Sequence, residues 1–508
     1  MADGVRSAIR SALAQPAMMI GGEEAASASG ATLEDLDPAT GETIASIPDA
    51  GAPDVAAAVS AAREAFPGWS RTPAAARTRI LNALADALER DQERISGIET
   101  LDNGRPRRET GSQSAIVAKW FRYFAGMTDK YEGRTLPVEG PYLNYTRRVP
   151  VGVCAAVTPW NHPMLIATKK IAPALACGNT MVVKPSELAP LSVLELGRLA
   201  LQAGLPPGVL NVVTGGRSAG EALSTSEGVD RIDVTGSTPT GVAVARAAAG
   251  TLKRVGLELG GKAPNVVFAD ADLERTLRGV AFSAFIAQGQ SCVSGSRVLV
   301  QEEIASEFAR RLAELVATIR VGDPMLADTQ LGPVITPASA TRVRDHIQGA
   351  LADGAIALCG GADPPSLSDG LSSDGYVAPT VLAADDAKIR VAREEIFGPV
   401  ATVTPFRDED EAVAIANDVP FGLGAGVWTR DVSRAHRVAD RIQAGIIWIN
   451  DYHRNDPASP WGGFKLSGYG RENGWFAVEE YTETKSVWVP LEQQDLAWYD
   501  ADDGERLN

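Results

Sequence analysis

Four short apolar segments, each followed by a polar or glycine-containing turn, constrain the fold of this chain more than any other feature. A helical pattern separates each segment from the next, so strands and helices alternate. This alternation predicts a parallel, doubly wound sheet with right-handed crossovers. Ligands of such sheets bind at the carboxyl ends of the strands, so the turns are candidate binding sites. The segments are residues 151–157, 180–183, 211–213 and 231–234, and the helical patterns are 164–176, 191–204 and 217–225.

A second alternating region at 262–450 predicts a second α/β unit. Upstream of the first sheet, a helix is expected at 54–66, capped by Asp54 after Pro53. Residues 1–17 are rich in Ala and Ser and are expected to be a loosely held extension. The remaining expected elements are two helices in 73–102, helices at 111–130, 273–288, 302–319 and 338–353, and strands at 143–149, 296–300, 377–382, 399–405, 445–450 and 485–489.

The charge balance and the cysteine pattern argue against several functions. A net charge of −16 disfavours nucleic acid or an anionic membrane as a partner. No stretch approaches the ~18 consecutive apolar residues of a membrane-spanning helix, and no signal peptide is expected at the N-terminus. The four cysteines form no Cys-x-x-Cys pair and no metal pattern with the four histidines. Free thiols and no metal are therefore expected, in a cytoplasmic protein.

Cys292 lies in a glycine-flanked turn between an apolar stretch and the strand expected at 296–300. Gly289 and Gly295 let a substrate and the backbone amides come close to the sulfur, which suits a nucleophile. A buried structural cysteine is the alternative, because free cysteines are among the most buried residues. The cysteine by itself does not decide between the two.

Seven segments, in this order and at this spacing, resemble the NAD(P)-dependent aldehyde dehydrogenase superfamily over about residues 18–490. One such turn is weak evidence, whereas seven at the family's spacing are specific. The segments are Pro159-Trp160-Asn161, Lys184-Pro185-Ser186-Glu187, Thr235-Gly236-Ser237-Thr238, Glu258-Leu259-Gly260-Gly261-Lys262, Gly289-Gln290-Ser291-Cys292, Glu394-Glu395-Ile396-Phe397-Gly398-Pro399, and Gly462-Gly463 through Arg471-Glu472.

The resemblance implies an α/β fold with two doubly wound parallel-sheet domains and a small oligomerisation sheet. A homo-oligomer, dimer or tetramer, is expected. The implied parts are a dinucleotide-binding domain at 18–132 and 151–260, a catalytic thiol domain at 261–450 with a returning loop at 451–478, the oligomerisation sheet at 133–150 and 479–497, and extensions at 1–17 and 498–508.

The resemblance also implies a mechanism for oxidising an aldehyde to its acid. Cys292 matches the family nucleophile, and Asn161 matches the oxyanion donor that works with the backbone N–H of Cys292. Glu258 matches the base that activates the hydrolytic water. Read alone, Asn161 is better explained as a turn residue and Glu258 as a surface carboxylate. Lys170 and Glu472 match a proton-relay pair, and an ordinary salt bridge explains them equally.

The implied cofactor is NAD, with NADP less favoured. Gly236 and Ser237 would begin a helix whose N-terminus binds the diphosphate. Glu187 would meet a 2′-phosphate unfavourably, because both are negative. The remaining matches are Trp160 beside the phosphates, Lys184 with Glu187 at the adenine ribose, and Glu395 and Phe397 at the nicotinamide.

The sequence departs from the family pattern at two positions, and the second of them bears on the substrate. The sequence does not specify the structure of the substrate beyond an aldehyde. Ala287 replaces an Asn found in many relatives, which weakens local hydrogen bonding. Lys169 stands where relatives often have Trp, and it favours an anionic substrate tail, unless it pairs with an internal acid. Trp461 instead favours an aromatic or cationic tail. The residues expected to line the substrate tunnel are Ile116, Trp120, His162, Lys169, Ile286, Asn455 and Trp461.

Two other functions are compatible with the same fold. A coenzyme-A-acylating enzyme would generally lack the Glu258 equivalent, and a catalytically silent relative would have lost the nucleophile or the base. This chain keeps both residues.

Overall fold

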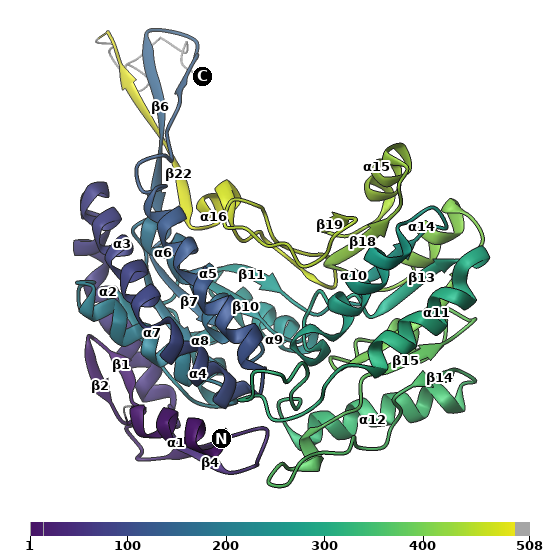
Figure 1. Ribbon diagram of the computed structural model, residues 1–508. Coiled ribbons are helices and arrows are strands. Elements are labelled where there is room, and N and C mark those ends of the chain that lie inside the picture. Colours follow the sequence, from purple (N-terminus) through teal and green to yellow (C-terminus); the bar gives the residue numbers. More distant parts are fainter. Residues whose placement is uncertain (1, 14, 493–508) are drawn as a thin grey trace.

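Two large β-sheets with flanking helices form the body of the molecule, and a narrow three-stranded sheet projects from it (Figure 1). The structure is a computed structural model and describes residues 2–13 and 15–492. The expected extension at 498–508 lies outside the described residues. Within the described part of the chain, no helix is long and apolar enough to cross a membrane.

The first sheet contains the four predicted strands, and they run parallel as predicted. Later strands lie on both sides of the central strand β7, which is the doubly wound arrangement. Short antiparallel strands complete both edges. In spatial order the strands are β2 (Glu23–Ala25), β1 (Met18–Ile20), β9 (Leu210–Val212), β8 (Thr180–Lys184), β7 (Val153–Val157), β10 (Arg231–Thr235), β11 (Arg254–Glu258) and β21 (Gly468–Tyr469).

Helices cover both faces of the first sheet. Val153 and Ala155 of β7 pack on the layer of α2, α8 and α9, whereas Cys154 and Ala156 pack on the opposite layer. Burial on both faces explains why these strands are continuous apolar runs. The helices of this part are α2 (Ala52–Ser70), α3 (Ala74–Arg90), α4 (Gln92–Asn103), α5 (Arg107–Ala125), α6 (Pro163–Ala176), α7 (Leu191–Gln202), α8 (Arg217–Thr225) and α9 (Thr238–Ala249).

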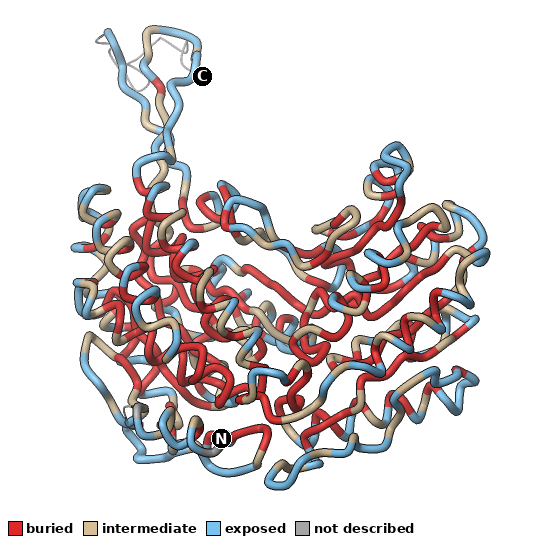
Figure 2. The backbone as a smooth tube through the Cα atoms, in the orientation of Figure 1, coloured by how far each residue is buried: buried red, intermediate tan, exposed pale blue. Residues whose placement is uncertain are grey.

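The second sheet has seven strands, all parallel except its edge strand β14. Its central strands are buried between helical layers, as in the first sheet, whereas the edge strand β14 is largely exposed (Figure 2). In spatial order they are β14 (Ile356–Cys359), β15 (Thr380–Ala383), β16 (Val400–Phe406), β13 (Arg297–Gln301), β12 (Pro264–Val267), β18 (Gly424–Trp428) and β19 (Ile446–Ile449). The helices are α10 (Leu273–Phe285), α11 (Glu302–Ala317), α12 (Pro337–Ala352), α13 (Arg390–Arg393), α14 (Glu409–Asn417) and α15 (Val432–Arg441).

The projecting sheet pairs distant parts of the chain. Strand β6 (Tyr142–Pro150) lies between β22 (Thr482–Pro490) and the short β5 (Thr135–Leu136), and both neighbours are antiparallel to it. The strands predicted at 143–149 and 485–489 are confirmed, with longer limits. Large apolar side chains are exposed on this sheet, among them Trp488 and Val489. Residues 493–497 of the expected segment lie outside the described residues.

The N-terminus differs from the prediction. Residues 2–12 form helix α1 (Ala2–Ala12), and Arg6 of this helix is buried. Its guanidinium group donates to Asp37 at 2.8 Å and to both carboxylate oxygens of Asp323 at 2.6 and 2.7 Å. The expectation of a loosely held extension is therefore wrong for these residues, because partners distant in sequence hold the helix.

Smaller differences have local causes. Helix α2 begins after Gly51, and Asp54 is its third residue, where the carboxylate accepts the N–H of Gly51 at 2.8 Å. Asp54 is thus half of a capping box and not the cap itself. Helix α5 begins directly after Pro106 and ends at Ala125. The other short elements are β3 (Thr32–Leu36), β4 (Thr43–Pro48), β17 (Phe421–Gly422), β20 (Phe464–Lys465), η2 (Ser373–Gly375) and α16 (Gly474–Glu480).

Candidate active site

The turn that carries Cys292 follows a sharp change in the backbone. Helix α10 ends at Phe285, and a single 3-10 turn, η1 (Ile286–Gly289), replaces the last predicted residues of the helix. Ala287 and Gln288 have φ angles of 52° and 56°, and Gly289 has 68°. Left-handed non-glycine residues cost on the order of 1 kcal/mol each and persist only where surrounding contacts hold them. Asn tolerates this conformation better than Ala, so Ala287 makes the turn more dependent on its contacts.

Side chains from distant segments supply those contacts. The carboxylate of Glu109 on α5 accepts the N–H of Ala287 at 3.0 Å. The side chain of Gln288 donates to the carbonyl of Gly104 at 2.8 Å. Gly289 must be glycine, because a Cβ there would collide with the carbonyl oxygen of Gly398. The turn is therefore held in place by helix α5 and by its neighbours.

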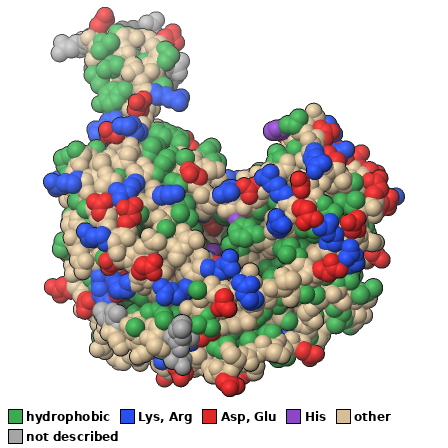
Figure 3. Space-filling model, in the orientation of Figure 1, with side chains coloured by type: hydrophobic (Ala, Val, Ile, Leu, Met, Phe, Trp, Pro, Cys, Tyr) green, Lys and Arg blue, Asp and Glu red, His purple; other side chains and the backbone are tan. Residues whose placement is uncertain are grey.

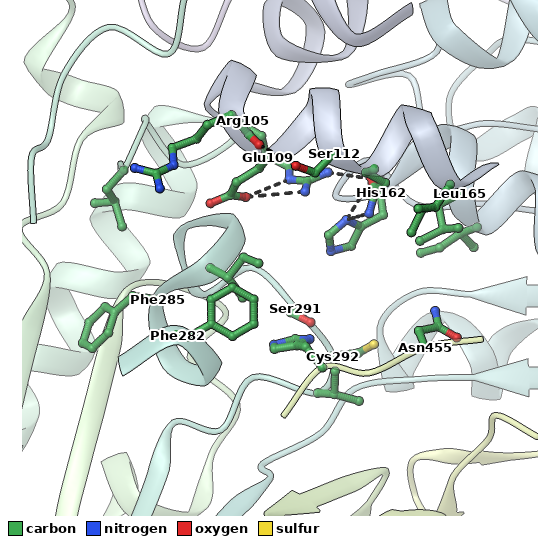
Figure 4. A pocket seen from close by; sticks show the side chains of 18 of the residues that line it. Arg105, Glu109, Ser112, His162, Leu165, Phe282, Phe285, Ser291, Cys292 and Asn455 are labelled. Atoms are coloured by element: carbon green, nitrogen blue, oxygen red, sulfur yellow. Dashed lines mark hydrogen bonds and ion pairs between the residues drawn. The ribbon is translucent and has the colours of Figure 1, made fainter. Parts of the chain in front are cut away.

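Cys292 opens into a cavity of about 660 Å³ between the two large sheets. Figure 3 shows the hollow on this face, with basic side chains near its rim. Helix α5 contributes Glu109 to one wall, His162 lies above the turn that carries Cys292, and Phe282 and Phe285 come from α10 (Figure 4). The predicted residues that line this cavity are Ile116, His162, Lys169, Glu258, Ile286, Cys292, Asn455, Trp461 and Glu472.

Asn161 follows strand β7 and is attached to the Cys292 turn. Its side-chain amide donates to the carbonyl of Gln290 at 2.8 Å, and its carbonyl oxygen accepts the N–H of His162 at 3.0 Å. An amide NH₂ group has two donors, so a second N–H is left over for a ligand. Within the described residues, no acceptor is found for the backbone N–H of Cys292. Two donors thus lie close to the nucleophile turn.

Glu258 ends strand β11 and lines the cavity with Cys292. It is buried, and one of its carboxylate oxygens has no partner within the described residues. Burial raises the pKa of Glu258 well above its usual range, and the neighbouring Glu472 raises it further. Lys170, Lys169 and Arg471 act in the opposite direction. The result is a desolvated carboxyl group with high basicity, as a general base requires.

Two adjacent lysines of α6 meet the carboxylate of Glu472. The Nζ of Lys170 lies 2.6 Å from one oxygen, and the Nζ of Lys169 lies 3.7 Å from the other. Lys169 also lies over the ring of Trp461, 3.9 Å from its centroid. Trp461 and Glu472 face each other across an isolated antiparallel bridge, so the returning loop presents both to α6.

Trp120 does not belong to the tunnel. It is buried in α5, and its indole N–H donates to the side chain of Asn473 at 2.9 Å. Trp120 follows Ile116 by four residues and shares its side of α5, but the bond to Asn473 holds its ring in the core, so the prediction for Trp120 is wrong.

Several cavity residues were not predicted. Arg105 donates to the side chain of Gln113 at 2.8 Å, and the Gln113 amide lies 2.9 Å from Nδ1 of His162. The i, i+4 spacing of Glu109 and Gln113 could have indicated a polar face on α5. His453 has a left-handed backbone, with φ 61°, and packs on Phe282. Burial lowers the pKa of His453 to about 4, so its ring is neutral at neutral pH. No local signal marks that position.

The residues predicted to bind the diphosphate and the adenine ribose follow strands of the first sheet or lie near their ends. Trp160 follows β7, Lys184 ends β8, and Gly236 follows β10. Ser237 caps helix α9, and a Cβ at Gly236 would meet nothing within 4 Å, so a phosphate group has room to approach the helix N-terminus. A second cavity, of about 630 Å³, is lined by residues that include Ser237, Thr238, Glu394 and Glu395.

The other predicted cofactor contacts also have geometry that suits a nucleotide. The Nζ of Lys184 lies 3.4 Å from the carboxylate of Glu187, whose side chain is partly exposed. Rings of Trp160 and Phe397 meet edge to face at 5.4 Å. Glu395 accepts the N–H of Gly261 at 2.9 Å, and burial raises its pKa to about 7. The contacts of these residues with the cofactor stay predictions.

Comparisons with known proteins agree with this geometry. The model of the aldehyde dehydrogenase family matches residues 25–487. Retinal dehydrogenase 2 of Homo sapiens is 43% identical over 476 residues, which are 92% of this chain and 90% of that protein. Betaine aldehyde dehydrogenase of Cereibacter sphaeroides is 43% identical over 493 residues, 96% of this chain and 100% of that protein. The crystal structure of betaine aldehyde dehydrogenase from Staphylococcus aureus in complex with NAD+ has a TM-score of 0.94 at 36% identity, and covers 97% of this chain and 99% of its own.

Proposed function

This chain belongs to the aldehyde dehydrogenase family, and from that premise we propose that it oxidises an aldehyde to its carboxylic acid with NAD, through a covalent intermediate on Cys292. The observation that carries the proposal is that Cys292 and Glu258 line one cavity, beside an asparagine amide attached to the nucleophile turn. The staphylococcal relative was crystallised with NAD+, which supports NAD as the cofactor here.

In the first step, the thiolate of Cys292 attacks the aldehyde carbon and forms a C–S bond. The carbonyl electrons move to oxygen, which becomes negative. The free N–H of the Asn161 amide and the backbone N–H of Cys292 donate to this oxygen. Donors of this kind are worth roughly 3–4 kcal/mol of transition-state stabilisation. NAD, when bound, supplies the acceptor for the hydride that the tetrahedral carbon loses, which leaves a thioester on Cys292.

In the last step, Glu258 takes a proton from a water molecule, and the water oxygen attacks the thioester carbon. The C–S bond breaks, the acid leaves, and Cys292 is restored. A carboxyl group whose pKa burial raises binds this proton more strongly than an exposed one. The contact between Lys170 and Glu472 offers a route by which Glu258 returns the proton toward the outside, since both charges influence Glu258.

The presence of Glu258 favours hydrolysis of the thioester over its transfer to coenzyme A, because an acylating enzyme does not need a base that activates water. The retained nucleophile and base also speak against a silent relative. NADH formation over many turnovers, with NAD and a simple aldehyde, tests the proposal: much more than one equivalent of NADH per active site should form without coenzyme A. NADH that stops at one equivalent until coenzyme A is added would favour the acylating function, and no NADH with any aldehyde would favour the silent relative.

The projecting sheet supports self-association as a dimer or tetramer. Trp488 is 57% exposed there, beside Tyr142 at a ring distance of 5.9 Å, and Leu143 and Val489 are exposed as well. A thin sheet with apolar side chains in water is expected to be covered by another copy. Light scattering of the wild type against Trp488→Asp tests this, and a wild-type mass of one chain would contradict it.

A further inference from the structure

Lys169 lines the cavity beside Cys292 and Glu258, yet no step of the reaction uses it. Its side chain is only 4% exposed. A buried ammonium group is costly unless a counter-charge compensates it. Glu472 supplies the counter-charge at 3.7 Å, and the face of the Trp461 ring lies at 3.9 Å from the nitrogen. A ring face attracts a cation, so both contacts favour the charged form of Lys169.

We propose that Lys169 is a positioning residue whose fixed positive charge stabilises the thiolate of Cys292 before the aldehyde binds. The inference rests on the proposed role of Cys292 as the nucleophile. It gives this lysine an electrostatic task within the enzyme, in place of a contact with the substrate.

The charges around the sulfur explain why such a cation is needed. Burial raises the pKa of Cys292 to about 12, and Glu258 contributes most to this among the facing charges. Glu395 and Glu472 also raise the pKa, whereas Lys169 lowers it. Carboxyl groups from three segments thus oppose the thiolate, and Lys169 is the cation that acts against them among the main influences on the sulfur. Tyr452 is another titratable group that interacts with the sulfur. Burial raises the pKa of its phenol, and Cys292 raises it further.

Burial also weakens the charge that opposes Lys169. It raises the pKa of Glu258 well above its usual range, so this carboxyl group is less readily ionised than an exposed one and repels a thiolate less. Lys169 is itself influenced by several groups. Burial lowers its pKa, Glu472, Glu258 and Cys292 raise it, and Lys170 lowers it. A charged Lys169 and a thiolate at Cys292 thus stabilise each other.

The neighbouring Lys170 is not equivalent. Its Nζ lies 2.6 Å from Glu472, and it is absent from the lining of the cavity. Lys169 makes the longer contact to the same carboxylate and faces the cavity, so its charge is the one presented to the sulfur.

The test is the pH dependence of Cys292 alkylation by iodoacetamide, which reacts with the thiolate. The variants are Lys169→Met, Lys169→Arg and Lys169→Gln, and the label is quantified on the peptide that contains Cys292. Lys119→Met is the matched control, because Lys119 is an exposed lysine of α5. Circular dichroism shows whether each variant is folded. If the Met variant does not fold, the Gln variant replaces it in the comparison.

We expect Lys169→Met to slow alkylation about tenfold at every pH below the thiol pKa, which corresponds to a rise of about one unit in that pKa. Lys169→Arg should restore most of the rate, and Lys119→Met should match the wild type. A Met or Gln variant whose alkylation rate stays within about 1.5-fold of the wild type across this pH range overturns the inference. Alkylation needs neither aldehyde nor NAD, so a failure of the proposed oxidation would leave this readout unaffected.

Discussion

The side-chain nitrogen of Lys169 lies 3.9 Å from the centre of the Trp461 ring, between that ring and the carboxylate of Glu472. Read separately, the two residues predict opposite substrates, because Lys169 favours an anionic tail and Trp461 an aromatic or cationic one. In the folded chain each is the partner of the other. We propose that the pair does not select a charged aldehyde, which removes the contradiction between the two predictions.

Lys169→Ala should accordingly lower kcat/KM for carboxylated and neutral aldehydes of equal length by similar factors. The reason is that the change weakens the nucleophile, which every substrate needs. Steady-state kinetics on matched pairs of aldehydes provide the measurement. A rise in KM of roughly tenfold or more, confined to carboxylated aldehydes, would correspond to a lost contact of about 1.4 kcal/mol and would assign Lys169 to substrate binding.

Cys292→Ser should bind NAD but lose turnover by about 10³-fold or more, because a hydroxyl group without a dedicated base is a poor nucleophile. Fluorescence titration with NAD measures binding, and NADH formation measures turnover. Activity above about one per cent of the wild type would refute the assignment of Cys292.

Glu258→Gln should form about one equivalent of NADH per active site and then turn over slowly, since acylation remains and hydrolysis stops. In the wild type, only the deprotonated form of Glu258 accepts the proton from water. Because its pKa is raised, the steady-state rate should keep rising with pH above the range in which an exposed glutamate is already deprotonated. Stopped-flow absorbance across pH measures both effects. A steady-state rate in the Gln variant equal to that of the wild type would remove Glu258 from the mechanism.

Glu187→Ser should narrow the preference for NAD over NADP. The carboxylate lies 3.4 Å from Lys184 and is partly exposed, where it would face a 2′-phosphate with the same charge sign. The ratio of kcat/KM values for the two cofactors is the measurement. If the wild type already uses both equally, the assignment of Glu187 to the ribose is wrong.

Arg6→Ala should destabilise the protein by about 3–5 kcal/mol, because it leaves the carboxylates of Asp37 and Asp323 without their buried cation. Arg10→Ala on the same helix is the matched control. Arg10 lies 3.0 Å from Glu42, which is 64% exposed, so that change should cost only about 0–1 kcal/mol. Urea denaturation midpoints compare the two variants, and equal midpoints would show that helix α1 contributes little to stability.

Local pattern was sufficient for much of the fold. Strands β7, β8 and β10 are buried on both faces, so each is a continuous apolar run that the sequence shows directly. The turns that follow these strands carry Asn161, Glu187 and Gly236, as predicted. Short edge strands such as β1 and β21 escaped prediction. With three and two residues, they are too short to show an alternating or continuous apolar pattern, and each forms against a neighbouring strand that offers hydrogen-bonding groups.

The sequence by itself determined which residues can do chemistry, because a thiol, a carboxylate and an amide in glycine-rich turns are local features. Only the tertiary structure decided their partners. Glu472 is 302 residues from Lys170, and Glu109 holds Ala287 from another domain of the sequence. Trp120 turns to the core although it lies one helical turn from Ile116. Charges, pKa shifts and strained backbone angles arise from packing between distant segments, and no local pattern of residues carries that information.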